Sequence, residues 1–236
     1  MKNQSIGMYR IESERQGSGE GDFLRTMHRR IRHQRSDGSY SEPYQCDSVL
    51  RRMGMDAVAM VLYFRAGQEG RLGLEGQEGP EGQEGPWQLR VGLRTSRRPA
   101  LLLDRPDLCD RPLDGLLWEI PAGILEAGDL GEAGRRHRCA LEAREEMGAE
   151  VEDEAFELLG PPIWLSPGVM AEQVFLYQAA IRPPGEALPE GDGSPMEEDV
   201  DVAWLTLREA LDRCERGRTD AKTELALRRF AAFHGA

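Results

Sequence analysis

The feature that most constrains the fold is an unbroken apolar run, AVAMVLYF, at residues 57–64. An apolar run of this length, with no polar residue at every second position, is typical of a strand buried in the core. A second strand signal follows at residues 87–93. We expect these two segments to pair as a hairpin within the main sheet.

The chain between these two strands is of low complexity. Residues 75–86 read EGQEGP twice, and a partial copy, GQEG, stands at 67–70. A Gly/Pro/Glu tract cannot bury enough apolar area to offset the entropy lost on ordering. We therefore expect a flexible loop at about residues 66–86, and deletion of 75–86 should leave folding and activity nearly intact.

The remaining elements follow one another without a repeating βαβ unit, which favours an α+β fold with helices packed on a mixed sheet. Gly148 stands at the end of one helical segment, where a left-handed cap is expected. Strands are expected at 100–103, 116–120, 174–181 and 200–205, and helices at 135–148, 207–215 and 221–233.

The N-terminal part differs in composition from the rest of the chain. Residues 1–22 are polar and rich in Gly and Ser, which predicts a flexible tail. Residues 23–52 are rich in arginine around the turn signal Ser-Asp-Gly-Ser at 36–39, which predicts an antiparallel strand segment. The main domain is then expected at 53–236.

The charge of the chain is acidic and unevenly distributed. Thirty basic and 42 acidic residues give a formal charge of −12, which argues against a nucleic-acid partner. Residues 119–160 hold twelve acidic and four basic residues, and residues 186–201 hold seven acidic and no basic residues. Because such regions repel anions, we expect the binding of a phosphate substrate to depend on a divalent metal ion.

The location of the protein is predicted from what the sequence lacks. No stretch approaches eighteen consecutive apolar residues, and the N-terminus has no apolar core followed by a small-residue cleavage site. We therefore expect neither a membrane span nor a secretory signal. The four cysteines lie far apart with no CxxC pair, which fits reduced thiols and a cytoplasmic protein.

Three glutamates stand in the predicted helix at 135–148. Glu142, Glu145 and Glu146 are spaced i, i+3 and i+4, so they share one face of the helix. Repulsion between neighbouring carboxylates destabilises such a face. The pattern is typical either of a solvated acidic face or of a site that binds divalent cations.

Motifs around these glutamates favour the second interpretation. The run Trp-Glu-Ile-Pro-Ala-Gly at 118–123 precedes a glycine-rich loop, and the helix ends in Leu-Glu-Ala-Arg-Glu-Glu-Met-Gly at 141–148. This arrangement resembles the Nudix box, a Gly, five residues, a Glu, seven residues and then Arg-Glu-U-x-Glu-Glu-x-Gly-U, in which U is a bulky aliphatic residue. The resemblance is closest to the ADP-ribose pyrophosphatase branch, whose further motifs are similar to Ser-Arg-Arg-Pro at 96–99, Ser-Pro-Gly through Glu at 166–172 and Asp-Ala-Lys-Thr at 220–223.

The box departs from the family pattern in several places. The segment from Gly123 to the end of the helix is four residues longer than in the family. Leu141 stands where the box has Arg, and Ala143 where it has a bulky aliphatic residue. The first Glu of the box has Asp129 and Glu132 as candidate counterparts. In the family that Glu and the Arg form an ion pair that braces the loop, so the departures bear on the rigidity of the loop.

The resemblance implies a Nudix-type α/β/α sandwich that hydrolyses a nucleoside diphosphate sugar, with ADP-ribose favoured, to a nucleoside monophosphate and a sugar phosphate. It implies Mg²⁺ as the cofactor, with Mn²⁺ as an alternative. The implied ligands are the backbone carbonyl of Ala122 and the side chains of Glu142, Glu145 and Glu146. The implied general base lies on a loop outside the box, where Glu198 is the first choice and Glu197 its neighbour, with Glu146 as the alternative.

Substrate contacts and partners are implied in the same way. Arg98 corresponds to an arginine that contacts a phosphate or the terminal ribose, and Glu119 would accept hydrogen bonds from a ribose or an adenine edge. Trp118 is either a core residue or a platform that stacks on the base. The family also implies a homodimer in which the strands of residues 23–52 reach the partner. Two alternatives remain open: a sibling substrate such as GDP-mannose or UDP-glucose, and a Nudix-fold nucleotide-binding module with weak turnover.

Overall fold

The computed structural model describes two compact units, one formed by residues 1–56 with 164–173 and the other by residues 57–163 with 174–236. The described residues are 4–6, 9–16, 23–51, 54–66, 88–98, 101, 115–184, 189, 191 and 200–235. The predicted loop at 66–86 lies outside them except for its first residue, and so does the predicted strand at 100–103 except for Leu101.

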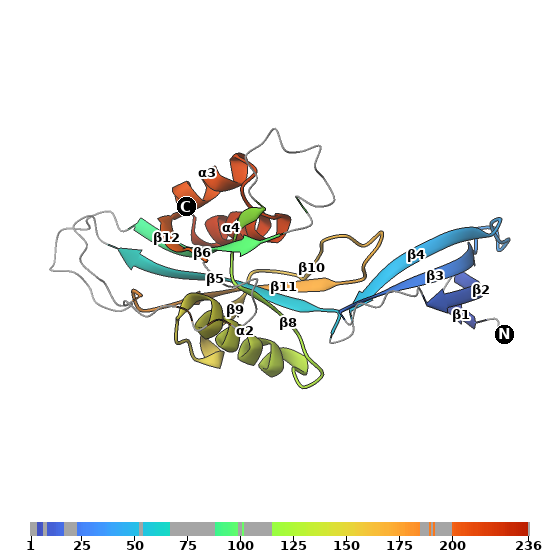
Figure 1. The fold of residues 1–236 in the computed structure, drawn as a ribbon, viewed down its shortest axis with the longest axis horizontal. Coiled ribbons are helices and arrows are strands. Elements are labelled where there is room, and N and C mark those ends of the chain that lie inside the picture. Colours follow the sequence, from blue (N-terminus) through green and yellow to red (C-terminus); the bar gives the residue numbers. More distant parts are fainter. Residues whose placement is uncertain are drawn as a thin grey trace. The chain divides into compact units, whose positions relative to one another are not determined.

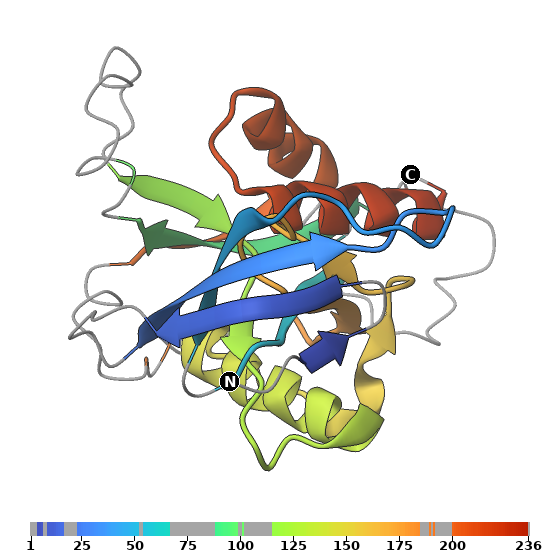
Figure 2. The same cartoon turned by 90° about the vertical axis from the view of Figure 1, so that its right-hand side faces the viewer.

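The first unit contains a four-stranded sheet in the order β1-β2-β3-β4, in which every neighbouring pair is antiparallel (Figure 2). Its strands are β1 (Gln4–Ile6), β2 (Tyr9–Gln16), β3 (Leu24–His33) and β4 (Tyr44–Arg51). The hairpin predicted from the turn signal is confirmed: Gly38 adopts a φ of 83°, and the Asp37 carboxylate accepts hydrogen bonds from the Ser39 amide and hydroxyl. The structure differs from the flexible tail expected for residues 1–22, because β1 and β2 fall within it.

The second unit is built on a mixed sheet with the strand order β10-β11-β5-β6-β12. The central strand β5 (Ala57–Ala66) runs parallel to β11 (Gln173–Ala180) and antiparallel to β6 (Gln88–Arg97), which confirms the predicted hairpin of β5 and β6. The remaining strands are β7 (Leu116–Glu119), β8 (Ala122–Ile124), β9 (Glu157–Leu158), β10 (Ile163–Trp164) and β12 (Val202–Thr206).

Helices cover both faces of this mixed sheet. In Figure 1, α2 (Gly131–Met147) lies on one side, and α3 (Leu207–Glu215) and α4 (Ala221–His234) lie on the other. A single 3₁₀ turn, Asp153–Ala155, follows α2. The helices agree with those predicted, although α2 begins four residues before the expected residue 135. Within the described part of the chain, no helix is both long enough and apolar enough to cross a membrane.

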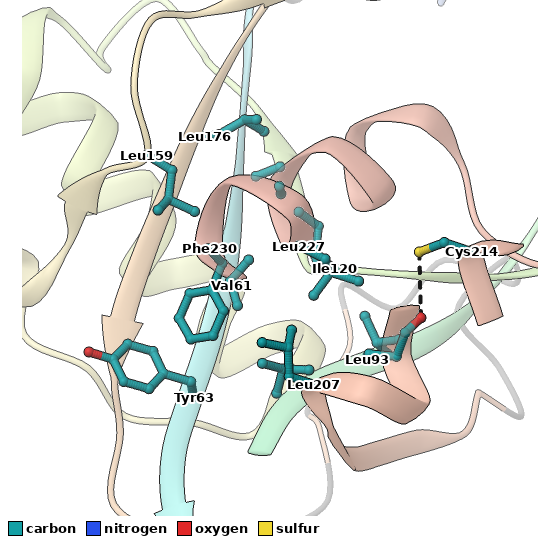
Figure 3. Packing of buried hydrophobic residues seen from close by; sticks show 14 of the residues in the cluster. Val61, Tyr63, Leu93, Ile120, Leu159, Leu176, Leu207, Cys214, Leu227 and Phe230 are labelled. Carbon is teal, nitrogen blue, oxygen red and sulfur yellow. Dashed lines mark hydrogen bonds between the residues drawn. The ribbon is translucent and has the colours of Figure 1, made fainter. Parts of the chain in front are cut away.

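The apolar run that forms β5 is buried on both of its faces, as predicted. Its odd-numbered residues, including Val61 and Tyr63, pack in one cluster with Leu227 and Phe230 of α4 (Figure 3). Its even-numbered residues, including Met60, pack in a second cluster that contains Cys139, Ala143 and Met147 of α2. A strand between two helical layers needs apolar side chains at every position, which explains the unbroken run. The predicted α+β fold class, with helices packed on a mixed sheet, is therefore confirmed.

Candidate active site

The acidic helix α2 ends at the predicted glycine. Gly148 has a φ of 63°, and its N–H donates to a carbonyl oxygen of the last turn, that of Arg144. At the other end, a Cβ on Gly134 would lie 2.3 Å from the carbonyl carbon of Asp129. Glycine at this position lets the preceding loop pack directly on the first turns of the helix, so α2 continues through a residue with poor helix propensity.

Two of the three predicted metal ligands on α2 converge on the backbone of β8. The Ala122 N–H donates to Oε2 of Glu146 at 2.8 Å. A Cβ on Gly123 would lie 1.9 Å from Oε1 of Glu142, so only glycine leaves room for this carboxylate. Since Glu142 and Glu146 are one helical turn apart, their carboxylates reach two adjacent residues of β8, Gly123 and Ala122.

The third predicted ligand, Glu145, is not joined to this pair by a described contact. Its side chain makes no hydrogen bond or ion pair with any residue that the structure describes. Among those residues, no three His, Cys, Asp or Glu side chains are spaced as a metal site. The donor set still fits Mg²⁺, because this ion is commonly held by one or two carboxylates together with substrate phosphates.

Arg94 on β6 is a site residue that the sequence analysis missed. Its buried guanidinium forms an ion pair with Glu146 of α2. On the same face of β6, a Cβ on Gly92 would lie 2.6 Å from Cε of Met147, so this glycine allows α2 to pack closely. The available signal was that Arg94 directly follows the apolar segment Val91-Gly92-Leu93 of the predicted strand, since a buried charge requires a partner.

Arg98 and Glu119, which were predicted separately as substrate contacts, bind each other. Nε of Arg98 donates to Oε1 of Glu119 at 2.7 Å, and Nη2 donates to Oε2 at 2.6 Å. The Glu119 carboxylate is 2% exposed, whereas the Arg98 side chain is 43% exposed. Burial raises the pKa of Glu119, but the hydrogen bonds from Arg98 and the charge of Lys222 outweigh it, so the pKa lies below its usual value. Glu119 therefore holds Arg98 in place, and its contact with a ribose or an adenine edge stays a prediction.

The strand register places this pair on the same face of the sheet as Glu146. Arg94 of β6 lies directly opposite Glu119 of β7. Cross-strand partners in an antiparallel pair project their side chains to the same face. The Arg94–Glu146 pair and the Arg98–Glu119 pair therefore form one charged cluster, in which Arg94 and Glu119 are buried.

Trp118 lies on the opposite face, one residue before Glu119. Its indole packs against the cluster that contains residues of α3 and α4, and the Arg213 guanidinium lies 3.9 Å from the ring centroid. Trp118 also lines a cavity of about 560 Å³ together with Thr95, Leu116, Asp201 and residues of α3. The structure thus does not bring Trp118 together with Arg98, because adjacent residues of a strand point to opposite faces.

The bracing ion pair of the box is present one helical turn earlier. Nε of Arg138 lies 2.9 Å from Oδ2 of Asp129, and its Nη2 lies 3.1 Å from Glu126. The Arg138 side chain also reaches Oε1 of Glu142, at 3.7 Å. Glu132, the other candidate, instead pairs with Arg135 and Arg136. Asp129 and Arg138 therefore take the place of the missing Glu and Arg of the box. Because Arg138 supplies this ion pair, the loop is braced although Leu141 stands where the box has Arg.

Two further predictions concern the general base and the Ser-Pro-Gly motif. Glu197 and Glu198 lie outside the described residues. In the first unit, the Ser-Pro-Gly segment forms a turn in which the Ser166 carbonyl accepts from the amides of Val169 and Met170. Glu172, which ends this motif, forms an ion pair with Arg51 at 2.6 Å.

A sheet between two helical layers, with an acidic helix that follows a glycine loop, defines the class of the Nudix-type sandwiches. The chain belongs to the NUDIX domain family, whose profile matches residues 89–226, more than half of its length. The resemblance in the sequence is thereby confirmed, and the protein is a Nudix pyrophosphohydrolase.

Solved structures show the same fold. The chain matches 103 solved chains. One, described as the crystal structure of an ADP compounds hydrolase, has a TM-score of 0.61 and 14% sequence identity, and the match covers 98% of this chain and 96% of that one. No curated protein matches the chain.

Proposed function

We propose that the protein hydrolyses the pyrophosphate bond of a nucleoside diphosphate sugar in a reaction that depends on Mg²⁺ or Mn²⁺, with ADP-ribose as the favoured substrate. The observation that carries this proposal is the convergence of the Glu142 and Glu146 carboxylates on Ala122 and Gly123, beside the Arg98–Glu119 pair. The solved structure described as an ADP compounds hydrolase supports an adenine nucleotide as the substrate class.

Glu142, Glu145, Glu146 and the backbone carbonyl of Ala122 would hold the divalent cations. Bound cations would polarise the phosphoryl oxygens and lower the pKa of an attacking water. Arg138 contributes by holding Glu142 and the loop residue Asp129 together. Arg94 contributes by fixing the Glu146 carboxylate against the backbone of β8.

The reaction breaks one P–O bond of the pyrophosphate. Water adds to a phosphorus atom, its proton passes to Glu146 or to Glu198, and the bridging oxygen leaves with the other phosphate. The products are a nucleoside monophosphate and a sugar phosphate. Arg98 would bind a phosphate oxygen or the terminal ribose, because a guanidinium has five N–H donors and Glu119 accepts only two of them.

A panel assay tests this proposal. The protein is incubated with Mg²⁺ and ADP-ribose, GDP-mannose or UDP-glucose, and the release of phosphomonoester is measured. We expect turnover to be fastest with ADP-ribose. Faster turnover of GDP-mannose or UDP-glucose would show that ADP-ribose is not the preferred substrate, but the proposed reaction would stand. Binding without product release would instead favour a nucleotide-binding module, the role that the altered box with Leu141 and Ala143 would permit.

We also propose that the protein is a homodimer that uses the sheet of the first unit. In support, this unit exposes the large apolar side chains Phe23, Leu24, Tyr40 and Tyr44. Exposed apolar groups of this kind favour association. Sedimentation equilibrium should give twice the chain mass, and a monomer at micromolar concentration would contradict the proposal.

A further inference from the structure

We propose that Lys222, held by Asp220, is a positioning residue that fixes Glu119 and through it orients Arg98 for the substrate. This inference rests on the proposed function, in which Arg98 binds the substrate. Neither Lys222 nor Asp220 touches the reacting atoms, so both would act on recognition through Glu119 and Arg98.

The contacts converge on a single oxygen atom. Oε2 of Glu119 accepts from Nζ of Lys222 at 2.6 Å and from Nη2 of Arg98 at 2.6 Å. Lys222 is 8% exposed, and it also forms an ion pair with Asp220. Asp220 is therefore paired with Lys222, and Glu119 is held by both Lys222 and Arg98.

The backbone fixes the position of Lys222 relative to Glu119. Asp220 caps α4, because its Oδ1 accepts from the Thr223 N–H at 2.9 Å. Oγ1 of Thr223 accepts from the N–H of Ile120, the residue that follows Glu119, at 3.1 Å. The first turn of α4 is thus joined to the end of β7, which places Lys222 next to the Glu119 carboxylate.

The electrostatics of the cluster explain why Lys222 is needed. Burial lowers the pKa of Lys222, but the charges of Asp220 and Glu119 outweigh it, so the pKa is raised and the ammonium stays charged at neutral pH. The negative charges of Asp220 and Glu119 are then balanced by the positive charges of Lys222 and Arg98. Without the ammonium, both carboxylates would attract the one remaining cation, Arg98, which already interacts with Asp220. The guanidinium would lose the orientation that its paired hydrogen bonds with Glu119 impose.

The composition of the chain supports a specific need for lysine at this position. Of the 30 basic residues only two are lysines, Lys2 and Lys222. Arginine has a planar fork that suits paired carboxylate oxygens, whereas lysine has a compact ammonium with three donors. A compact ammonium can meet Asp220 and Glu119 at once in a buried space and leave Oε1 of Glu119 to Arg98.

The test is a double-mutant cycle with Lys222→Met and Arg98→Ala, read as KM and kcat for ADP-ribose with saturating Mg²⁺. Lys222→Met should raise KM about tenfold, with the effect mainly on KM, because a tenfold change corresponds to about 1.4 kcal/mol, the size of one charge-assisted hydrogen bond. The same substitution should have little effect on KM in the Arg98→Ala background. Asp220→Asn keeps the cap of α4 but removes the charge, so it should raise KM by a smaller factor.

Arg228→Met is the matched control, because it removes an exposed ion pair with Glu224 on the same helix. It should leave KM unchanged. A KM for Lys222→Met equal to that of the wild type, or an equal effect in both backgrounds, would overturn the inference and leave Lys222 with a role in stability alone.

A ligand-free measurement separates this inference from the proposed function. The Nε–H resonance of Arg98, assigned from its loss in Arg98→Ala, should exchange with water faster in Lys222→Met than in the wild type. If the wild type turns over no member of the panel, the proposed function fails, but this exchange still reports whether Lys222 orients Arg98. Unchanged exchange would overturn the positioning role.

Discussion

At the scale of single residues, both carboxylate oxygens of Glu146 have a partner within the protein. One oxygen accepts the Ala122 N–H and the other is paired with Arg94. Arg94 comes from the buried strand β6, so the carboxylate has few alternative positions. This preorganisation means that Glu146 can meet a cation or a water without first being ordered.

We predict that Glu146→Gln lowers turnover by about 10²–10⁴-fold, because the amide can neither accept a proton nor bind a cation well. Product release under saturating Mg²⁺ measures the effect, and circular dichroism checks that the fold is intact. Arg94→Met is the comparison, since it breaks the same ion pair but leaves the carboxylate in place. Turnover of Glu146→Gln near that of the wild type would remove this residue from the site.

A second prediction at this scale concerns the stability that Glu119 contributes. Its pKa is lowered in the folded protein by Arg98 and Lys222, which outweigh its burial, so the folded state binds the proton less well than the unfolded chain. The stabilisation is therefore present at neutral pH and is lost as the pH falls below about 4, through the lowered pKa. The difference in unfolding free energy between the wild type and Glu119→Gln should shrink over this range in urea titrations. A constant difference from pH 7 to pH 3 would show that the charge of Glu119 does not stabilise the fold.

At the scale of elements, the loop before α2 and the helix itself behave as one piece. The side chain of Arg138 on the helix binds Asp129 and Glu126 of the loop, and the amide of Glu126 donates to Oδ2 of Asp129 at 2.9 Å. Gly134 allows the backbone of the loop to lie against the first turns. The insertion in the box therefore lengthens the loop, but the loop still contacts the helix through Arg138.

We predict that Arg138→Leu destabilises the protein by roughly 1–3 kcal/mol, because its ion pair with Asp129 is only partly buried. It should also lower activity by roughly 10- to 100-fold, as expected when a residue that supports a metal ligand is lost. Hydrogen exchange should become faster at the amides of residues 123–130. Arg136→Leu removes an ion pair with Glu132 on the same helix and should leave this exchange unchanged. Slow exchange at these amides in Arg138→Leu would contradict the bracing role.

Elements whose signals are local could be predicted from the sequence. The bounds of α3 were predicted correctly, because the apolar periodicity stops at residues that also cap the helix, such as Thr206. The start of α2 was placed too late, since Gly131 and Gly134 have poor helix propensity and the packing on Asp129 that compensates for it is tertiary. The strands within residues 1–22 were missed because their sequence is polar and shows little apolar alternation, whereas β2 is formed by pairing with β1 and β3.

For the candidate site too, only residues with a local pattern could be predicted from the sequence. The glutamates of α2 could be predicted because they share one helix face. Their partners could not, since Arg94 lies 52 residues from Glu146, and Lys222 lies 103 residues from Glu119. The side to which Trp118 points depends on strand register, and a shift of one residue exchanges the two faces of a strand. Sequence alone therefore indicated candidate site residues, but could not show which pairs they form.

At the scale of the whole molecule, the charge of −12 is distributed in relation to the site. The segment 119–160, which contains α2 and its loop, holds twelve acidic and four basic residues. The sheet positions Arg94 and Arg98, and the first turn of α4 positions Lys222, but each of these cations is paired with a carboxylate. The charges of these cations are therefore largely balanced by carboxylates of the protein, although Arg98 keeps N–H donors that Glu119 does not use.

We predict that the affinity for a nucleoside diphosphate sugar falls by at least about 100-fold without divalent metal, because the phosphates then meet unscreened carboxylates of α2. Calorimetry with ADP-ribose, in Ca²⁺ or in EDTA, measures the difference without depending on turnover. Adenosine is the matched ligand, since it has the base and the ribose but no phosphate, and its weaker binding should be the same in both buffers. Equal affinity for ADP-ribose in both buffers would mean that the arginines of the sheet bind the phosphates themselves, and the carboxylates of α2 would then have no role in binding the substrate.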